Sequence, residues 1–519
     1  MVGAQLNMAN GIREFGRATP DRVAVIDGDR RLTFAGLDDR SNRLASALLG
    51  RGLEPGQPVA VLSGNRLEYI EIATALAKAG LPMVPLNSRN GAADNEFIVG
   101  HSGARTLLLD PALAAGASSV LDGLDAVLAF SAGSDAGGDA VGEDYEAVLA
   151  AADPRDPQVP VNELDAFCIT YTSGTTGRPK GVVLTHRSRV LTNYAAAVEY
   201  GLGPSRSTMA TAPLYHGAGF AFAYAGPQLG GTVSVLRQWD PEEFLRMLAD
   251  SRSNTVFLVP THASQIRRVV DEPARAYDLS ALQTLYFNAA ALPVALKEWV
   301  HDAFPGVGVH ELYGSTECSV VTDLRPEDSL RKAGSVGHPW FMNEVRLLED
   351  GIEVPAGTPG ELFARSPMLM KGYLHDEAAT AAATTPDGFV TVGDIAVRDD
   401  EGFLSIIDRK TDTIIVGGVN VFPREIEEVA AQHADVGDVA VLGVPDDVYG
   451  ERIAAFVVAR KGGGSVDAAS VEAHVRAHVA RYKVPREWHV VDELPRNPGG
   501  KVLKREIRAR YVKGTMVGR

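Results

Sequence analysis

Residues 171–187 read YTSGTTGRPKGVVLTHR, and this stretch decides how the rest of the chain is interpreted. Its glycines permit positive φ and a close approach of the backbone to a ligand. Its hydroxyl groups and the ammonium of Lys180 are donors that suit a polyphosphate. A Walker-type loop needs G-x-x-x-x-G-K-S/T, whereas here Gly174 and Gly177 are too close together and Gly181 follows the lysine. The stretch therefore predicts a phosphate-binding loop of another kind, with a mobile surface loop as the alternative.

The length and composition indicate a soluble enzyme-sized chain. Its 519 residues exceed the usual size of one domain, so we expect more than one. The formal net charge of −16 argues against a nucleic-acid-binding surface. Two cysteines, Cys168 and Cys318, cannot form a disulfide framework, and no signal peptide is evident, so we expect a cytoplasmic protein. Prolines and glycines in the uncharged run 207–236 argue for an interior wall and against a transmembrane segment.

The first part of the chain alternates strand and helix patterns. Apolar runs at 23–28, 59–65 and 81–87 predict strands, and amphipathic runs at 37–49 and 66–80 predict helices. This order is typical of mainly parallel sheets covered by helices.

A second domain is expected near the C-terminus. The pattern there predicts helices at 423–433 and 470–482, strands at 438–444, 452–460 and 487–491, and a basic helix from about Val502. This is a small α+β domain. We place its boundary at Asp408–Asp412, which divides the chain into domains 1–408 and 409–519.

Four further stretches carry groups suited to chemistry. YGSTE contains Glu317, a reasonable Mg²⁺ ligand or simply part of a polar turn. APLYHGAGF contains His216, which alone would more often be a core residue. VGDIA contains Asp394, a turn residue or a carboxylate able to bind two ribose hydroxyls. PRNPGGK ends on Lys501, in a glycine-rich loop before a helix, where a solvated lysine is the alternative.

Together and in this order, these motifs resemble those of the adenylate-forming superfamily, which contains acyl-CoA synthetases, peptide-synthetase adenylation domains and firefly-type luciferases. The resemblance covers nearly the whole chain, from TFAGLDDRSNRLASALLGRGLEPGQPVAVL to PRNPGGK, and includes GELFARSPMLMKGY and DRKTDTIIVGGVNVFPREIE. It implies an α/β fold: a large N-terminal domain of helix-covered, mainly parallel sheets plus a distorted β-barrel subdomain, and a small mobile C-terminal α+β domain.

The resemblance also implies roles for individual residues. The loop over the ATP β- and γ-phosphates would consist of Thr172, Ser173, Gly174, Thr175, Thr176, Gly177 and Lys180. Adenine and the α-phosphate would meet Asn288, Ala289, Ala290, Tyr313, Gly314 and Thr316. Asp394 and Arg409 would hold the ribose hydroxyls, and Glu317 would hold Mg²⁺.

The remaining implied roles concern the acid and coenzyme A. The acyl pocket would be lined by His216, Gly217, Ala218 and Gly219. Gly417 and Gly418 would flank the pantetheine channel, and Lys501 would be the catalytic lysine of the first half-reaction.

The implied reaction has two steps. A carboxylate attacks the α-phosphate of ATP and pyrophosphate leaves; a thiol then attacks the acyl-adenylate and AMP leaves. Mg²⁺ and Lys501 would offset the charge that concentrates in the first step. The small domain would rotate between steps about residues 408–412. Thr411 stands where Asp or Lys is common, and NAAALP replaces a more glycine-rich turn.

We therefore expect an ATP-dependent acyl-CoA synthetase acting on a hydrophobic monocarboxylic acid, with ATP, Mg²⁺ and coenzyme A as cofactors. The alternatives are an aryl-acid (cinnamate- or benzoate-type) CoA ligase and a stand-alone adenylation enzyme loading another thiol. An adenylation module would need an acid near PLYH, and a non-catalytic scaffold would have lost Lys501 or Glu317. The lack of a basic residue close to His216 in sequence disfavours a dicarboxylate. A homodimer and an acetyltransferase acting on Lys501 stay open as partners.

Overall fold

The structure is a computed structural model that describes residues 5–130, 141–172, 179–416, 419–446, 448–460, 466–496 and 502–514. The chain divides into two compact units. Unit 1 comprises Met1–Val345 and Ala364–Val392, and unit 2 comprises Arg346–Phe363 and Gly393–Arg519. None of the helices in the described ranges is both long and apolar enough to cross a membrane.

Unit 1 contains a nine-stranded sheet in the order β16-β15-β14-β13-β12-β10-β11-β1-β2. Its strands are β1 (Val23–Asp27), β2 (Arg30–Thr33), β10 (Ser207–Ala210), β11 (Thr232–Val235), β12 (Thr255–Leu258), β13 (Thr284–Phe287), β14 (Gly308–Ser315), β15 (Ser319–Leu324) and β16 (His338–Pro339). The central pairs are parallel, while β1–β2, β14–β15 and β15–β16 are antiparallel.

A second sheet in unit 1 has eight strands in the order β20-β9-β8-β4-β3-β5-β6-β7. They are β3 (Val59–Leu62), β4 (Met83–Leu86), β5 (Thr106–Leu109), β6 (Ala126–Ala129), β7 (Glu143–Asp144), β8 (Ala166–Thr172), β9 (Lys180–Thr185) and β20 (Gly372–Tyr373). Strands β3 to β8 pair in parallel, and β8 pairs antiparallel with β9; the described ends of the phosphate-loop motif, Thr172 and Lys180, belong to these two strands.

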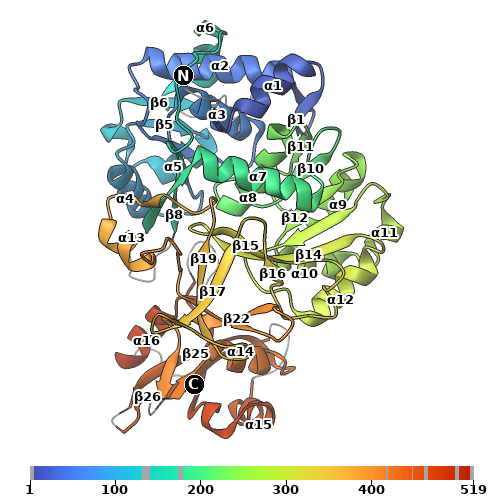
Figure 1. Ribbon diagram of the computed structural model, residues 1–519, viewed down its shortest axis with the longest axis vertical. Coiled ribbons are helices and arrows are strands. Elements are labelled where there is room, and N and C mark those ends of the chain that lie inside the picture. Colours follow the sequence, from blue (N-terminus) through green and yellow to red (C-terminus); the bar gives the residue numbers. More distant parts are fainter. Residues whose placement is uncertain are drawn as a thin grey trace. The chain divides into compact units, whose positions relative to one another are not determined.

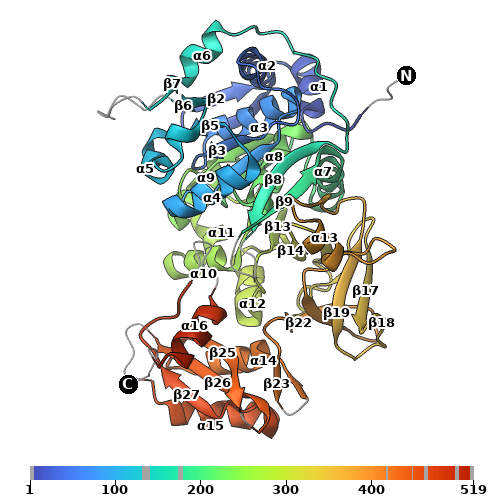
Figure 2. The same cartoon turned by 90° about the vertical axis from the view of Figure 1, so that its left-hand side faces the viewer.

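The helices of unit 1 cover and connect the sheets (Figures 1 and 2). They are α1 (Asn10–Ala18), α2 (Phe34–Gly50), α3 (Leu67–Ala79), α4 (Ala92–Ser102), α5 (Ala114–Ala117), α6 (Tyr145–Ala151), α7 (His186–Tyr200), α8 (Gly217–Gln228), α9 (Pro241–Asp250), α10 (Pro260–Val269), α11 (Pro273–Ala276), α12 (Val294–Ala303) and α13 (Glu377–Ala383), with short 3₁₀ turns η1 (Pro111–Leu113) and η2 (Leu121–Gly123).

Helices α7 and α8 join the two sheets. Helix α8 packs on β10 and β11 of the first sheet, α7 packs on β9 of the second, and the two helices contact each other. Nearly all of α8 is buried, as expected of a helix that is apolar on every side. The uncharged run 207–236 is therefore mostly interior, with His216 exposed.

Unit 2 contains a five-stranded sheet in the order β18-β17-β19-β21-β22: β17 (Glu344–Glu349), β18 (Ile352–Glu353), β19 (Gly360–Arg365), β21 (Asp394–Arg398) and β22 (Leu404–Arg409). The resemblance implied a distorted β-barrel subdomain within the N-terminal domain, without assigning it residues. A second sheet has β23 (Ile414–Val416), β24 (Val419–Val421), β25 (Val436–Asp446), β26 (Gly450–Ala459) and β27 (Glu487–Val490), with α14 (Pro423–Ala431), α15 (Ala468–His478), η3 (Arg481–Lys483) and α16 (Lys504–Val512).

The predicted α/β class is confirmed, and each strand and helix named from the sequence is present, with ends shifted by a few residues. The division at 408/409 stays a prediction. The compact units separate at Val392 instead, because β21 and β22 pair with each other and β21 pairs with β19.

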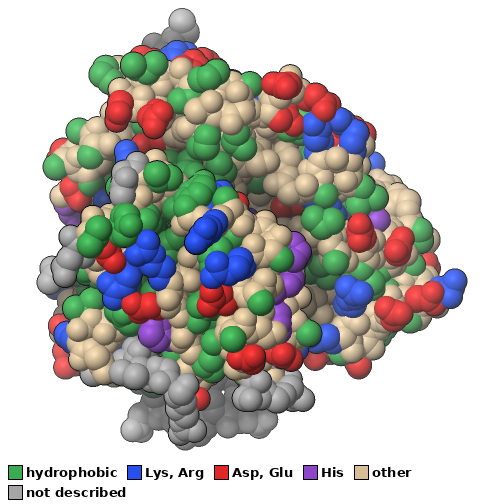
Figure 3. All heavy atoms as spheres, turned by 90° about the horizontal axis from the view of Figure 1, so that it is seen from below, with side chains coloured by type: hydrophobic (Ala, Val, Ile, Leu, Met, Phe, Trp, Pro, Cys, Tyr) green, Lys and Arg blue, Asp and Glu red, His purple; other side chains and the backbone are tan. Residues whose placement is uncertain are grey.

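The surface seen in Figure 3 carries both charges. Its acidic and basic side chains are interspersed and do not form separate positive and negative patches.

Candidate active site

The turn between β14 and β15 carries two predicted site residues, Thr316 and Glu317. Gly314 makes the turn possible, because a Cβ at this position would overlap the backbone carbonyl of Ser319. Ser319 itself has φ 61°, in the left-handed region. Glu317 is nearly buried, with 9% of its surface exposed. The local backbone thus presents a carboxylate with a restricted position.

Tyr373 links this turn to the phosphate-loop hairpin. Its phenol oxygen donates to Oε1 of Glu317 at 3.1 Å. Its ring face lies 4.8 Å from Nζ of Lys180, within the range of a cation–π contact. The pairing of β20 with β9 explains this position, because Tyr373 lies opposite Val182, two residues from the lysine. Burial, and then the charge of Glu317, raise the pKa of Tyr373, so the phenol remains a donor.

The described residues at the two ends of the predicted phosphate loop lie in paired strands. Thr172 and Lys180 are paired across the hairpin β8–β9. Ser173, Gly174, Thr175, Thr176 and Gly177 lie outside the described residues. Their role in binding the β- and γ-phosphates stays a prediction.

The start of helix α8 faces the same turn. His216 is the N-cap of α8, and a Cβ built on Gly217 would meet, in the part of the chain that the structure describes, only Oγ1 of Thr316, at 3.8 Å. The PLYH segment and the YGSTE turn, a hundred residues apart in sequence, therefore lie side by side. This juxtaposition is what an acyl pocket next to the α-phosphate requires.

Gly219 and Ala218 have other surroundings. A Cβ on Gly219 would overlap the carbonyl of Pro213, so this glycine is required by packing. Ala218 is partly buried against an aromatic-rich core cluster. Their place in the acyl pocket stays a prediction, and the size of residue 219 says nothing about room for a substrate.

A basic residue acts on His216 by its charge although none is close in sequence. Desolvation, and then the positive charge of Arg89, lower the pKa of His216. Arg89 has an exposed side chain and forms no ion pair with a described residue. Arg89 belongs to the loop after β4, far from His216 in sequence, and it weakens the case against a dicarboxylate.

The loop after β13 contains the residues predicted to lie along the adenine edge. Ala289 has φ 76°, a conformation that favours glycine, and its N–H is bonded to the Asn288 side chain. Farther along, the Leu292 N–H donates to Glu311 at 3.1 Å, and Glu311 pairs with the buried Lys297 at 2.7 Å. The loop is thus tied to β14, the strand of Tyr313 and Gly314.

The two predicted ribose ligands lie in unit 2. Asp394 and Arg409 are directly paired across β21 and β22, and Nε of Arg409 lies 3.3 Å from Oδ1 of Asp394. Gly417, Gly418 and Lys501 lie outside the described residues. Thr411 is exposed just beyond β22. The roles of these residues stay predictions.

Asn65 was not expected from the sequence. Its amide N–H groups donate to the carbonyls of Ala212 at 3.0 Å and Leu236 at 3.1 Å, and its oxygen accepts from the Leu214 N–H at 2.8 Å. It therefore holds the segment that leads to His216. A single asparagine after a predicted strand gives no sign of contacts with residues about 150 positions away.

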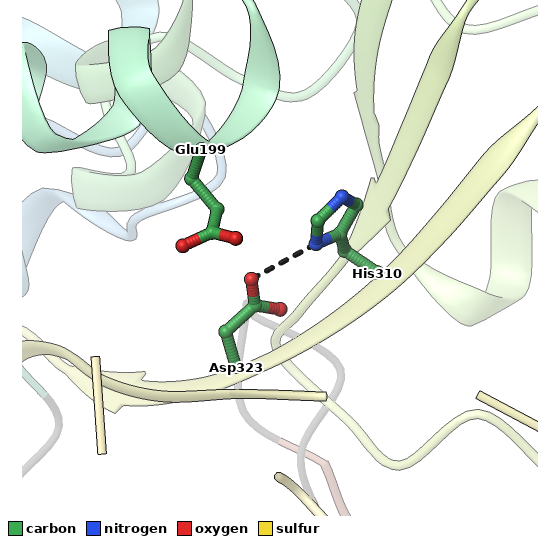
Figure 4. Close-up of side chains that lie close together, drawn as sticks. All are labelled: Glu199, His310 and Asp323. Atoms are coloured by element: carbon green, nitrogen blue, oxygen red, sulfur yellow. Dashed lines mark hydrogen bonds and ion pairs between the residues drawn. The ribbon is translucent and has the colours of Figure 1, made fainter. Parts of the chain in front are cut away.

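A separate cluster of ionisable side chains lies on the other face of β14 (Figure 4). Glu199 of α7, His310 of β14 and Asp323 of β15 bring their ligand atoms within 4.8 Å of one another. Nδ1 of His310 lies 2.9 Å from Asp323, and Arg325 binds Glu199 at 2.7 and 2.9 Å. Burial raises the pKa of Asp323. Since each carboxylate has a partner, this cluster is a charge network that ties the β14–β15 hairpin to α7.

The donor groups around Glu317 fit a magnesium ion. Mg²⁺ is usually held by one or two carboxylates, with phosphate oxygens and water supplying the rest. Glu317 supplies one carboxylate, Lys180 supplies positive charge suited to phosphate, and the Tyr373 hydroxyl occupies only one carboxylate oxygen. Glu317 is therefore able to hold Mg²⁺ together with a nucleotide.

The chain matches the AMP-binding enzyme family over residues 12–374 and the AMP-binding enzyme C-terminal domain over 425–501. It is 35% identical over 499 residues to a feruloyl-CoA synthase of Amycolatopsis sp., covering 95% of this chain and 97% of that one. It is 37% identical over 510 residues to a Mycobacterium tuberculosis propanoyl:CoA ligase whose acyl group carries a 7a-methyl-1,5-dioxo-octahydro-1H-inden-4-yl ring system, covering 95% and 96%.

The solved structures agree. The o-succinylbenzoate CoA synthetase of Bacillus subtilis, in complex with its acyl-adenylate intermediate, superimposes with a TM-score of 0.86 at 26% identity, covering 96% of this chain and 98% of that one. Both family domains match, the relatives are CoA ligases, and the fold extends over both chains. The chain belongs to the AMP-binding enzyme family and, within the adenylate-forming superfamily, to its acyl-CoA synthetase branch.

Proposed function

We propose that this AMP-forming acyl-CoA synthetase activates a hydrophobic, ring-bearing monocarboxylic acid. The observation that carries the proposal is the space at Gly217, where an added Cβ would meet, among the described residues, only Thr316 Oγ1, in ordinary contact. A bulky acyl group needs space at this point, next to the residue assigned to the α-phosphate. A medium or long fatty acid is the alternative within the same class.

The names of the relatives support a ring. A feruloyl group and an octahydroindenyl propanoyl group each join an acyl side chain to a ring system, and o-succinylbenzoate is a ring-bearing dicarboxylate. Their rings differ, so the shared chemistry is bulk and apolar surface near the carboxylate and not one particular substituent.

The residues of this chain would divide the work as follows. Mg²⁺, when bound by Glu317, neutralises charge on the phosphates. Lys180 adds positive charge beside the phosphate loop, and Asp394 with Arg409 offers paired groups for the ribose. Desolvation, and then Arg89, lower the pKa of His216, and its imidazole would orient the acid by hydrogen bonding. Lys501 is assigned to the first half-reaction.

A dicarboxylic acid is a second candidate, favoured by one observation. The charge of Arg89 acts on His216, and this guanidinium forms no ion pair with a described residue. An unpaired guanidinium suits a second carboxylate. The homodimer, acetylation of Lys501 and the cytoplasmic location likewise stay predictions.

The test is pyrophosphate release from ATP over a panel of acids, followed by detection of the CoA thioester. We expect ferulate or another ring-bearing monocarboxylate to give a higher kcat/KM than octanoate, palmitate or o-succinylbenzoate. The variant Glu317→Gln should lower the rate about 100-fold or more. A higher kcat/KM for a fatty acid would contradict the proposal that the substrate bears a ring. Pyrophosphate release without a CoA thioester would contradict the assignment of coenzyme A as the acceptor.

A further inference from the structure

Tyr373 contacts two residues of the predicted nucleotide site at once. Its hydroxyl donates to Glu317 Oε1 at 3.1 Å, and its ring lies 4.8 Å from Lys180 Nζ. Glu317 comes from the turn after β14, and Lys180 begins β9, so the two residues belong to different sheets of unit 1. Among the described contacts, this tyrosine is the side chain that touches both.

The backbone fixes the tyrosine from both sides. The Lys371 N–H donates to the Val183 carbonyl at 2.8 Å, and the Leu374 N–H donates to the Gly181 carbonyl at 2.7 Å. The Tyr373 N–H donates to Thr380 Oγ1 at 2.9 Å, which fastens β20 to helix α13. The backbone of Tyr373 is thus fixed to β9 and α13, so the position from which its phenol reaches Glu317 is restricted.

The turn of Glu317 is held by the same segment. The Met370 N–H donates to the backbone carbonyl of Glu317 at 2.7 Å. The segment 370–374 therefore grips Glu317 by its backbone and by its carboxylate, and grips β9 by hydrogen bonds on both sides of the tyrosine. Its position determines the spacing between the carboxylate and the lysine.

We propose that Tyr373 is a positioning residue that orients Glu317 toward the metal and holds Lys180 at the phosphate loop. The proposal rests on the proposed function of this site. Hydrogen bonds from outer residues to a metal-binding carboxylate fix its orientation, and their loss typically costs 10- to 100-fold in metal affinity or activity. The phenol keeps one oxygen of Glu317 occupied, so the other oxygen is the one left for the ion.

Two substitutions separate the two contacts. Tyr373→Phe removes the hydrogen bond to Glu317 and keeps the ring beside Lys180. Tyr373→Leu removes both contacts. The matched control is Tyr145→Phe, because the Tyr145 hydroxyl also donates to a glutamate, Glu71, in the same unit.

The measurement is the affinity of the enzyme for Mn²⁺, which replaces Mg²⁺, in the presence of a non-hydrolysable ATP analogue. Electron paramagnetic resonance detects the bound Mn²⁺. For Tyr373→Phe we expect Mn²⁺ affinity to fall about 10-fold. The Mg²⁺ concentration for half-maximal pyrophosphate release should rise by a similar factor, and excess Mg²⁺ should restore the rate. Tyr373→Leu should in addition weaken binding of the analogue at saturating metal. Tyr145→Phe should change thermal stability and leave the metal affinity at the wild-type value.

Wild-type Mn²⁺ affinity in Tyr373→Phe, with an unchanged Mg²⁺ requirement, would overturn the proposal. So would an equal loss in Tyr145→Phe, because the effect would then reflect general loosening. Failure of the wild-type enzyme to release pyrophosphate with any acid would contradict the proposed function alone, since the Mn²⁺ comparison needs no acid.

Discussion

Two positions of one motif hold glycine, but their surroundings differ. Gly217 and Gly219 both follow His216 and look equivalent in sequence. Among the described residues, a Cβ at 217 would make an ordinary contact with Thr316 and no overlap, whereas one at 219 would overlap the carbonyl of Pro213. Only the first position is therefore able to report on the acid.

Gly217→Leu should shift preference toward smaller acids. The added side chain would occupy space beside Thr316, so kcat/KM for a ring-bearing acid should fall at least about 10-fold relative to acetate or propionate. The KM for ATP should stay within about 2-fold. The measurement is pyrophosphate release with matched acids. An unchanged ratio between large and small acids would place the acyl group elsewhere.

Gly219→Ala is the companion variant. Its methyl group has no room, so the backbone must move, and the unfolding free energy should fall by about 1–3 kcal/mol. The fraction of soluble protein and the melting temperature report this loss. If Gly219→Ala were as stable as wild type and changed the acid profile, position 219 would belong to the pocket after all.

At the scale of elements, the loop after β3 in one sheet is hydrogen-bonded to segments that follow strands of the other sheet. Asn65 lies between β3 and α3 and bonds the segments that follow β10 and β11. At the opposite ends of these strands, Asn254 plays a comparable part: it accepts from the Ser207 N–H at 3.0 Å and donates to the Ala281 carbonyl at 3.1 Å. The two asparagines share a chemistry and differ in distance from His216.

Asn65→Ala should raise the KM for the acid about 10-fold, because the segment leading to His216 loses its two hydrogen bonds to Asn65 and the segment after β11 loses a third. Both Asn65→Ala and Asn254→Ala should lose about 1–3 kcal/mol of unfolding free energy, since buried polar groups are left unpaired. Only Asn65→Ala should change the acid KM. Equal kinetic effects in the two variants, measured at a temperature where both are folded, would show that Asn65 acts through stability alone.

The sequence predicted the elements well and the contacts between them poorly. Periodicity located β1, α2, α3 and the elements of the C-terminal part because it depends on neighbours a few residues away. NAAALP has alanines where a more glycine-rich turn is common, and one of them, Ala289, adopts a positive φ that favours glycine. The bond of Tyr373 to Glu317 spans 56 residues, and no local pattern encodes it.

At the scale of the whole molecule, the two units have separate hydrophobic cores. Clusters around Phe244 and Phe222 lie in unit 1, and a cluster around Val441 lies in unit 2. Unfolding therefore need not be a single transition, and a probe must report on one unit. Of the four tryptophans, only Trp488 lies in unit 2, so Trp488→Phe makes intrinsic fluorescence report on unit 1.

Acid should destabilise unit 1 through buried histidines. Burial lowers the pKa of His186 to about 3 and that of His262 to about 4, below the ordinary value of 6.5. The unfolded chain takes up protons below about pH 6.5 while the folded chain does not, so stability is lost as the pH falls from there toward the folded values. Each histidine should cost about 1.4 kcal/mol between about pH 7.5 and 5.5. Carboxyl groups with raised pKa, such as Asp323, act in the opposite sense.

A difference measurement isolates one histidine. His186 accepts from the Met8 N–H through Nδ1, and the amide oxygen of His186→Asn is able to accept the same bond. In the Trp488→Phe background, the variant should be less stable at about pH 7.5, because it loses contact with Phe167. Its disadvantage should shrink by about 1.4 kcal/mol at about pH 5.5, because asparagine does not titrate. Urea unfolding at the two pH values measures this change. A disadvantage that stayed constant would show that His186 takes up its proton in the folded state as readily as in the unfolded one.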